Sequence, residues 1–501
     1  MIENIAAGFE LFATTDNFLA LFAGVSIGVI IGAIPGMTVT MGVALTLPFT
    51  FTMHPVTGIL LLLGVYKGGI YGGSITAILI NTPGTPPAAC TVLDGYPLAK
   101  RGEAKRALDI ALYSSCFADF MSNLALIGLA GFLAAFALRF GPPEFFTLIV
   151  FSLTIIAGVS GDHLAKGLIA ACLGLALATV GLDLIYGTGR FVFDNYELMG
   201  GFSFIPVLIG LFAIPTIIDH YTRKPSARGH SSTLSKAGAS WADVKHCFKS
   251  MVRGSIIGVV LGAIPGIGGA PAAFLSYSEA KRNSKTPENF GKGEIEGIAA
   301  AESGNNGVAG ATMIPLLALG VPGDVITAVI LGAFMIHGLR PGPLLFQENI
   351  DIIYAIFMGI MLSSVYLFIV GKVSIRFISK IADLPDNILL PVVLVLCAYG
   401  AYAVNNNLFD ILVMLSMGVV GFVMLRTSVP AAPFLIAFVL GPLLEDSFRQ
   451  SLQLSEGTLG IFLRNEICIA FWILTVLALV LTIRRSLRDH KAAKITPSLD
   501  G

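Results

Sequence analysis

Long apolar runs, separated by short polar segments, dominate the chain; examples are 111–138, 353–370, 389–404 and 461–483. A helix needs about 20 apolar residues to cross the hydrocarbon of a bilayer. Only 12% of the 501 residues are charged, against about 25% in a typical soluble domain. We therefore expect an all-α polytopic membrane protein with about 10–12 membrane segments.

The charge balance and the missing enzyme motifs narrow the function. Basic and acidic residues number 31 each, so no strong field favours nucleic acid or an acidic partner. The sequence contains no GxxxxGK[ST] phosphate loop, no HExxH pair and no paired Cys/His spacing. We predict no catalytic residues, no organic cofactor and no metal other than a coupling sodium ion.

One motif, GAIPG, occurs twice, at 32–36 and at 262–266. Each copy ends a ladder of glycines four residues apart, at 24, 28, 32 and 36 and at 254, 258, 262 and 266. Glycines at this spacing share one helix face and let a second apolar helix approach closely. A second Pro-Gly pair follows in each half, at 83–84 and at 322–323. These matches indicate two internal repeats.

Basic residues predict the orientation of these repeats, because short loops rich in lysine and arginine stay in the cytoplasm. The basic segments 98–106, 223–253, 278–285, 371–380 and 484–494 are expected inside, and 48–55, 339–351 and 403–410 outside. The second GAIPG segment then enters and leaves from the cytoplasm, and the first from outside. We expect inverted repeats with re-entrant or broken helices.

Five parts follow along the chain from this pattern. We expect an N-terminal surface segment (1–18), a first membrane repeat (19–218), a basic cytoplasmic linker (219–251), a second membrane repeat (252–484) and a cytoplasmic tail (485–501).

The four Pro-Gly breaks are candidate binding elements. Irregular backbone inside a membrane is tolerated only where protein buries it or where it lines a polar cavity. Broken helices of inverted repeats can aim their N-termini at an anionic substrate. The alternative is a set of proline kinks that only shape the packing. The predicted substrate-binding residues are Pro35, Gly36, Thr38, Thr40, Lys67, Ser74, Asn81, Thr82, Gly84, Thr85, Gly266, Gly268 and Gly323.

Ionisable residues inside apolar segments are the other signal, since each is costly to insert. Lys67 either pairs with a substrate carboxylate or reaches the membrane interface. Glu302 either belongs to a sodium or proton site or caps a helix, and Asp324 has the same two interpretations. The predicted ion-binding residues are Glu302, Ser303, Asn305, Asn306 and Asp324.

Several long motifs carry a family resemblance. They are GAIPGMTV, YGGSITAILINTPGTPPAACTVLDGYPLAKRG, GAIPGIGG, SYSEAKRNSKTPENFGKGEIEGIAAAESGNNGVAG and LGVPGDVITAVILGAFMIHGLRPGPLLF, which span about 24–346. The sequence resembles the large membrane permease subunit of the bacterial tripartite tricarboxylate transporters. The resemblance departs at Lys67, where an uncharged residue is expected, and this bears on which anion fits.

The resemblance implies two protein partners, a small membrane subunit of four helices and a periplasmic solute-binding protein. It also implies binding-protein-dependent uptake of citrate-like tricarboxylates or other organic carboxylates across the bacterial inner membrane, driven by a sodium or proton gradient. A stand-alone carboxylate symporter, a passive channel and an integral-membrane enzyme are the alternatives.

Overall fold

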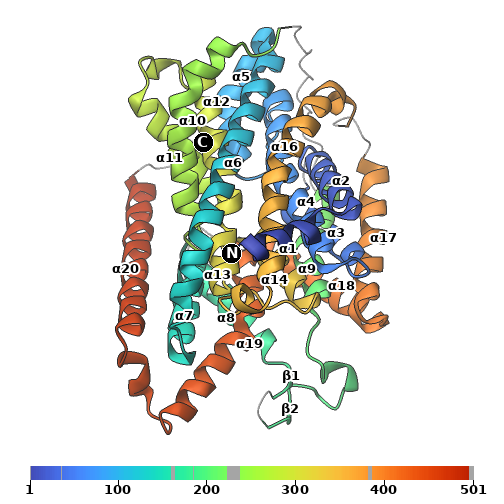
Figure 1. Cartoon of the computed structure of the whole chain (residues 1–501), viewed down its shortest axis with the longest axis vertical. Coiled ribbons are helices and arrows are strands. Elements are labelled where there is room, and N and C mark those ends of the chain that lie inside the picture. The colour runs from blue at the N-terminus through green and yellow to red at the C-terminus, as the bar shows by residue number, and fades with distance from the viewer. Residues whose placement is uncertain are drawn as a thin grey trace.

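The computed structural model describes residues 2–34, 37–159, 164–183, 186–222, 237–381 and 386–495, and they are predominantly helical. Figure 1 shows an elongated bundle of helices, with the strands β1 and β2 at its lower end. In chain order the elements are α1 (Ile2–Phe12), α2 (Thr15–Gly32), α3 (Val39–Thr46), α4 (Pro55–Ile80), α5 (Ala88–Leu98), α6 (Ala104–Ala137), α7 (Pro142–Val159), α8 (Leu164–Ala178), β1 (Gly181–Leu182), β2 (Gly189–Arg190), α9 (Phe204–Thr222), α10 (Trp241–Gly262), α11 (Gly269–Asn283), α12 (Ile295–Ala311), α13 (Met313–Leu319), α14 (Val325–Ile336), α15 (Leu345–Glu348), α16 (Ile350–Ile381), α17 (Asp386–Asn405), α18 (Leu408–Arg426), α19 (Ala431–Leu454) and α20 (Glu466–Ile495).

The composition of these helices confirms the predicted class. Within the described residues, seven helical segments of 18 residues or more are apolar enough to span a membrane, and shorter apolar helices accompany them. β1 and β2 form a two-stranded antiparallel pair in which Gly181 faces Arg190. The chain is therefore an all-α polytopic membrane protein.

The glycine ladder of the first repeat packs α2 against α4. A Cβ atom at Gly24, Gly28 or Gly32 would collide with the backbone carbonyl of Leu61, Val65 or Gly69, respectively. The partners keep a constant spacing of 37 residues from the glycines, so α2 and α4 run parallel and in contact. Only glycine permits this approach of two backbones.

The second ladder does the same for α10 and α12. A Cβ atom at Gly258 would meet the backbone of Gly304 and Gly307, and one at Gly262 would meet Val308. This pair of helices is parallel too. Both halves thus contain a helix, a turn, a return helix and a second helix parallel to the first, and the predicted repeat is confirmed.

Contacts at the two ends of these units show that the repeats are inverted. The first turn of α4 lies beside the end of α14, where a Cβ atom at Gly58 would lie 2.8 Å from the His337 ring nitrogen. At the opposite end, the Asp94 carboxylate on α5 accepts the backbone N–H of Glu294, just before α12, at 2.8 Å. The unit from α4 to α5 therefore runs in the opposite direction to the unit from α12 to α14.

Outside the broken helices, helices of the first half pack against helices of the second half. α8 packs against α19, and α9 packs against α18. Each contact is tightened by a glycine, since Gly174 lies on the backbone of Phe434 and Gly210 on that of Met414. Because these contacts run between the two halves, the halves pack as one unit.

Segments expected on the same side of the membrane do lie together. The Arg106 guanidinium is 2.5 Å from Asp243, which joins the segment 98–106 to the start of α10, and Lys372 reaches Asp109 at 2.6 Å. At the opposite end, a Cβ atom at Gly400, just before the segment 403–410, would lie 2.8 Å from Pro48 in the segment 48–55. α9 extends to Thr222 and α10 begins at Trp241, so helices occupy part of the expected linker 219–251.

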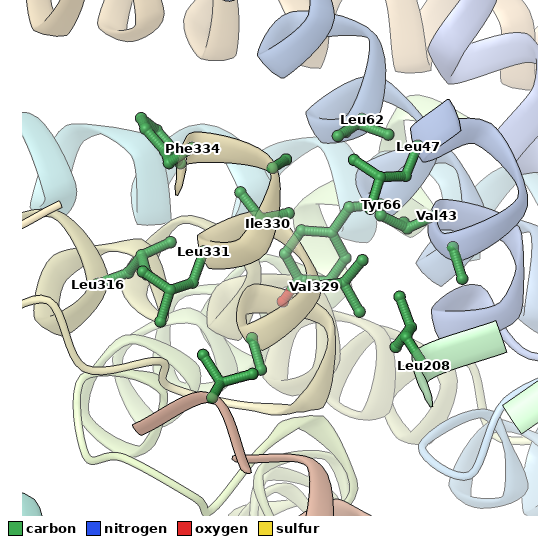
Figure 2. Close-up of a cluster of buried hydrophobic side chains, with 14 of the residues drawn as sticks. Val43, Leu47, Leu62, Tyr66, Leu208, Leu316, Val329, Ile330, Leu331 and Phe334 are labelled. Carbon is green, nitrogen blue, oxygen red and sulfur yellow. The ribbon is translucent and has the colours of Figure 1, made fainter. Parts of the chain in front are cut away.

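An apolar core holds the broken helices in place. Figure 2 shows Tyr66 on α4 surrounded by Val43 and Leu47 from the first return segment, Leu208 on α9 and Val329 on α14. All five side chains are buried. Because interiors pack as densely as organic crystals, this cluster fixes where the ends of α3 and α14 lie.

Candidate substrate cavity

All four predicted breaks interrupt helices in the structure. α4 ends at Asn81, whose φ of 58° is left-handed, and α13 ends at Gly320 with a φ of 72°. α10 stops before Gly266 and Gly268, whose φ angles of 87° and 69° favour glycine. The first break lies between α2 and α3; Pro35 and Gly36 within it fall outside the described residues.

The breaks of each half meet as a pair. In the second half, the Gly266 N–H donates to the Gly323 carbonyl at 2.6 Å. In the first half, Gly84 lies against the Gly32 carbonyl and donates its N–H to Gly73 at 3.2 Å. In the second half a backbone N–H of one break is thus satisfied by the other break, and in the first half the Gly84 N–H is satisfied by α4.

A cavity of about 250 Å³ lies between the two halves. Four helix N-termini contribute to its wall, those of α3, α5, α11 and α14. A helix N-terminus carries about half a positive charge. The lining residues are Thr38, Val39, Thr40, Tyr66, Ile70, Thr85, Pro86, Pro87, Phe212, Gly269, Asn305, Val308, Asp324 and Ile326.

Two polar atoms on this wall lack a protein partner. The Thr85 hydroxyl and the Asn305 side-chain nitrogen have no hydrogen bond within the part of the chain that the structure describes. Their residues are 6% and 2% exposed, respectively. Buried polar groups are nearly always paired, so these two unpaired groups make Thr85 and Asn305 candidate ligand contacts.

Asp324 caps a helix and faces the cavity at the same time. Its carboxylate accepts the backbone N–H of Thr327 at 2.7 Å, and Asp324 and Thr327 form a capping box at the start of α14. The Tyr66 hydroxyl donates to the second carboxylate oxygen at 3.1 Å and is 3.2 Å from the Thr312 hydroxyl. The capping interpretation is confirmed, and the ion-binding role stays a prediction.

Glu302 is fully buried on α12, away from the cavity wall. Its recorded hydrogen-bond partners among the described side chains are all neutral: Thr91, Ser115 at 3.0 Å and Asn306 at 3.4 Å. Ser74 on α4 lies close to the same carboxylate. The structure therefore brings Glu302 together with two predicted site residues, Ser74 and Asn306.

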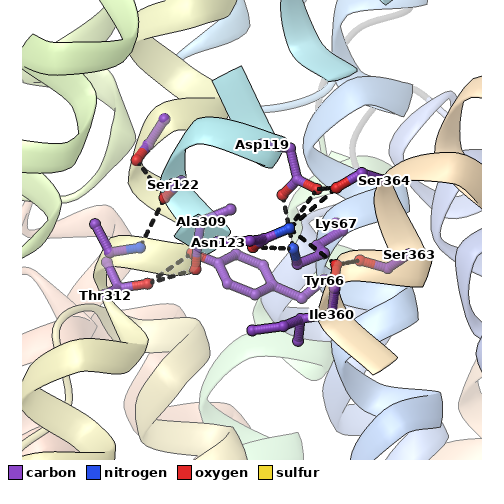
Figure 3. A network of polar contacts seen from close by, with 12 residues as sticks. Tyr66, Lys67, Asp119, Ser122, Asn123, Ala309, Thr312, Ile360, Ser363 and Ser364 are labelled. Carbon is purple, nitrogen blue, oxygen red and sulfur yellow. Dashed lines mark hydrogen bonds and ion pairs between the residues drawn. The ribbon is translucent and has the colours of Figure 1, made fainter. Parts of the chain in front are cut away.

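Lys67 forms a buried ion pair within the protein, and its contact with a substrate carboxylate stays a prediction. It is 2% exposed, so it does not reach the interface, and its amine lies 2.8 Å from Asp119 and 2.6 Å from the Asn123 side-chain oxygen. Figure 3 shows this network between α4, α6 and α16. Lys67 is absent from the cavity wall, although its neighbour Tyr66 is part of it.

The other predicted residues divide into three groups. Asn81 and Thr82 are exposed and do not line the cavity, and Ser303 faces Gly254 on α10. Gly84, Gly266, Gly268 and Gly323 shape the breaks through their backbone. The predicted residues that the cavity brings together are Thr38, Thr40, Thr85, Asn305 and Asp324.

Sequence reasoning missed the side chains that complete these sites. Tyr66 and Phe212 lie in apolar runs and look like core residues, and Asp119 and Asn123 look like polar interruptions of α6. The i, i+4 spacing of Asp119 and Asn123 was an available signal, because it places both on one helix face.

Asp94 is a further missed residue, and its role is structural. One carboxylate oxygen accepts the backbone N–H groups of Gly291, Gly293 and Glu294, each at 2.8 Å. The other accepts the Tyr277 hydroxyl at 2.8 Å. Asp94 thereby fastens the end of α5 to the loop that leads into α12.

The fold and the cavity define a class of protein: a polytopic membrane protein with inverted repeats of broken helices and a cavity lined by residues of both halves. The chain belongs to the TctA family of tripartite tricarboxylate transporters, since residues 18–436 match the model "Tripartite tricarboxylate transporter TctA family". It is thus a membrane permease of tricarboxylate transport.

Two relatives come from Agrobacterium vitis. An "uncharacterized 52.8 kDa protein in TAR-I ttuC' 3'region" is 36% identical over 491 residues, 98% of each chain. An "uncharacterized protein in TAR-II ttuC' 3'region" is 36% identical over 234 residues, 47% of this chain and 97% of the relative. No solved structure matches the chain.

Proposed function

We propose that this chain is the permease subunit of a binding-protein-dependent secondary transporter in a bacterial inner membrane. It takes up a citrate-like tricarboxylate or another organic carboxylate, together with sodium ions or protons. A small membrane subunit and a periplasmic binding protein complete the system, as the family name implies. The inverted hairpins expose the cavity alternately to the two sides of the membrane.

The convergence of four helix N-termini on one cavity carries this proposal. Their partial positive charges favour an anion without a permanent basic side chain on the wall. The free Thr85 hydroxyl and Asn305 amide supply donors for carboxylate oxygens. A carboxylate fits this set, whereas an apolar or cationic substrate would leave these donors and dipoles uncompensated.

Asp324 gives a reason for ion coupling. Its carboxylate faces the same cavity as the proposed anionic substrate, and its recorded partners Tyr66 and Thr327 are neutral. Two like charges in a low-dielectric site repel strongly. A sodium ion or a proton that neutralises Asp324 therefore favours substrate binding. Glu302 is the second candidate for such a cation.

Uptake into proteoliposomes tests the proposal. Vesicles that contain the permease and the small subunit are supplied with binding protein, a radiolabelled carboxylate and an inward sodium or proton gradient. We expect accumulation above the external concentration. Absence of uptake across a broad panel of organic acids and both gradients would contradict the proposal.

The same assay separates the alternatives. Uptake that persists without the binding protein would indicate a stand-alone symporter. Flux that only equilibrates the carboxylate would indicate a passive channel. An integral-membrane enzyme would change the chemical identity of the label, which chromatography of the vesicle contents detects.

A further inference from the structure

The network around Lys67 has the composition of a monovalent-cation site. The Lys67 ammonium contacts a carboxylate oxygen of Asp119 at 2.8 Å and the amide oxygen of Asn123 at 2.6 Å. The Ser364 hydroxyl lies behind them, 2.6 Å from Asp119. Carboxylate, amide and hydroxyl oxygens are also the ligands that bind hard metal cations.

Hydrogen bonds hold these oxygens in position. The Asn123 side-chain nitrogen donates to the Ile360 carbonyl at 2.9 Å and to Ser364 at 3.0 Å, which turns its oxygen toward Lys67. Asp119, Asn123 and Ser364 are at most 6% exposed. Figure 3 shows the oxygens gathered around the end of the Lys67 side chain.

Lys67 and Asp119 form a one-to-one ion pair. Asp119 is the acid recorded as an ion-pair partner of Lys67 in the described structure, and both side chains are 2% exposed. Removal of one partner from a buried ion pair leaves an uncompensated charge, which is strongly destabilising. Without the ammonium, Asp119 would have to take up a proton or another cation.

We propose that the Lys67 ammonium is a tethered cation that permanently fills a monovalent-cation site formed by oxygens of Asp119 and Asn123, which Ser364 holds in position. The site lies where α4, which contributes Tyr66 to the cavity wall, contacts α6 and α16. A free ion at this position would have to bind and leave in each transport cycle. The tether removes that requirement, so any coupling ion binds elsewhere, at Asp324 or Glu302.

Thermal unfolding of the purified permease tests this site without any transport assay, so its outcome is independent of the proposed function. The variant Lys67→Ala is melted in sodium chloride and in choline chloride of equal ionic strength. We expect sodium to raise its melting temperature by at least about 2 °C more than it raises that of the wild type. An increment equal to that of the wild type would overturn the proposal.

Two controls locate the response. The double variant Lys67→Ala/Asp119→Asn removes the negative charge of the proposed cation site. We expect its melting temperature to rise in sodium no more than that of the wild type. Lys372→Ala removes the ion-pair partner of Asp109 near the start of α6, where Lys372 is 34% exposed and the backbone N–H of Ala239 still donates to the Asp109 carboxylate. The same sodium increment in either control would contradict the assignment.

A second variant covers the case in which Lys67→Ala does not fold. Lys67→Ser also leaves room for an ion and adds an oxygen ligand. We expect it to fold in sodium and to lose stability in choline. Failure of both variants to fold in sodium would show that a free cation cannot replace the ammonium, and would overturn the proposal.

Discussion

Two residues of the cavity wall, Thr85 and Asn305, carry unused hydrogen-bonding atoms, and we propose that these atoms recognise an oxygen-rich ligand. They come from opposite halves of the chain, Thr85 just before α5 and Asn305 on α12. Each is buried, yet its free atom finds no protein partner among the described residues. A structural role alone would leave these groups desolvated at a cost.

We predict that Thr85→Val raises the substrate concentration for half-maximal uptake about 10- to 100-fold, because a hydrogen bond to a charged group contributes about 1.5–3 kcal/mol. The melting temperature should change little, since the hydroxyl has no protein partner. Concentration-dependent uptake and thermal melts measure the two effects.

The matched control is Thr147→Val on α7. This hydroxyl is also buried, but it bonds to the carbonyls of Pro143 and Glu144 and lies off the cavity wall. Its uptake should match that of the wild type. Equal defects in Thr85→Val and Thr147→Val would mean that Thr85 does not contact substrate.

The charge of Asp324 can be removed without removing the cap, because asparagine caps helices as well as aspartate does. We predict that Asp324→Asn folds normally but accumulates at least about 10-fold less carboxylate at steady state, equivalent to about 1.4 kcal/mol of lost coupling. Tyr66→Phe keeps the charge and should retain concentrative uptake. Wild-type accumulation by Asp324→Asn would place the coupling ion elsewhere.

Sequence reasoning selected residues that line the cavity where a side chain adjoins a break, and their role in binding stays a prediction. Thr38, Thr85 and Asp324 follow Pro-Gly pairs, and a broken helix exposes the residues after it. It failed for Tyr66 and Asp119, which lie within continuous helices. Their neighbours come from segments far along the chain, and one sequence does not specify those contacts.

At the scale of elements, the glycine ladders determine how the hairpins pack. Gly28→Ala would place a methyl group against the Val65 carbonyl and 2.8 Å from the Gly69 nitrogen. We predict a loss of about 1–3 kcal/mol in stability, the usual cost of overpacking, seen as a lower melting temperature.

Gly128→Ala on α6 is the matched control for this prediction. Apart from the backbone of α6 itself, no atom of the described residues lies within 4 Å of the position its methyl group would take. Both substitutions gain the same helix propensity, so their difference isolates the collision. A Gly28→Ala protein as stable as Gly128→Ala would contradict the close packing of α2 on α4.

The ion pair that joins the start of α6 to α10 should respond to acid. The Arg106 guanidinium, with the Ser240 N–H and hydroxyl, lowers the pKa of Asp243 to about 2. The folded value lies below the unfolded value of about 3.9, so the pair stabilises the protein above about pH 4 and loses this effect toward pH 2.

Because the ion pair is partly hydrated, we expect it to contribute less than about 1 kcal/mol to the free energy of unfolding. Asp243→Asn should melt below the wild type at pH 7, and the two melting temperatures should converge as the pH falls below about 4. A difference that stays constant from pH 7 to pH 3 would show that the ion pair is not its source.

Element boundaries were predictable where caps and Pro-Gly pairs mark them. The ends of α4 and α13 at the second pair of breaks are examples. The start of α10 at Trp241 was not anticipated, since 223–253 is polar and basic. Its first turn forms through a capping box of Ser240 and Asp243 and through the contact with Arg106, which is a tertiary interaction.

For the whole molecule, two inverted halves meet at one cavity. Charge placement predicted the inversion, because basic loops alternate between the halves. The pairs α8–α19 and α9–α18 were beyond sequence reasoning, since apolar helices without distinct motifs do not specify their neighbours. The central claim is that both halves contact the same carboxylate.

Substrate protection of paired cysteine variants tests that claim most directly. Thr40→Cys reports on the first half and Ile326→Cys on the second, both partly accessible positions on the cavity wall, in a background with the exposed Cys172 replaced by serine. The account predicts that one transported carboxylate slows thiol modification at both positions with the same concentration dependence. Protection of only one position, or of neither, would contradict a shared site.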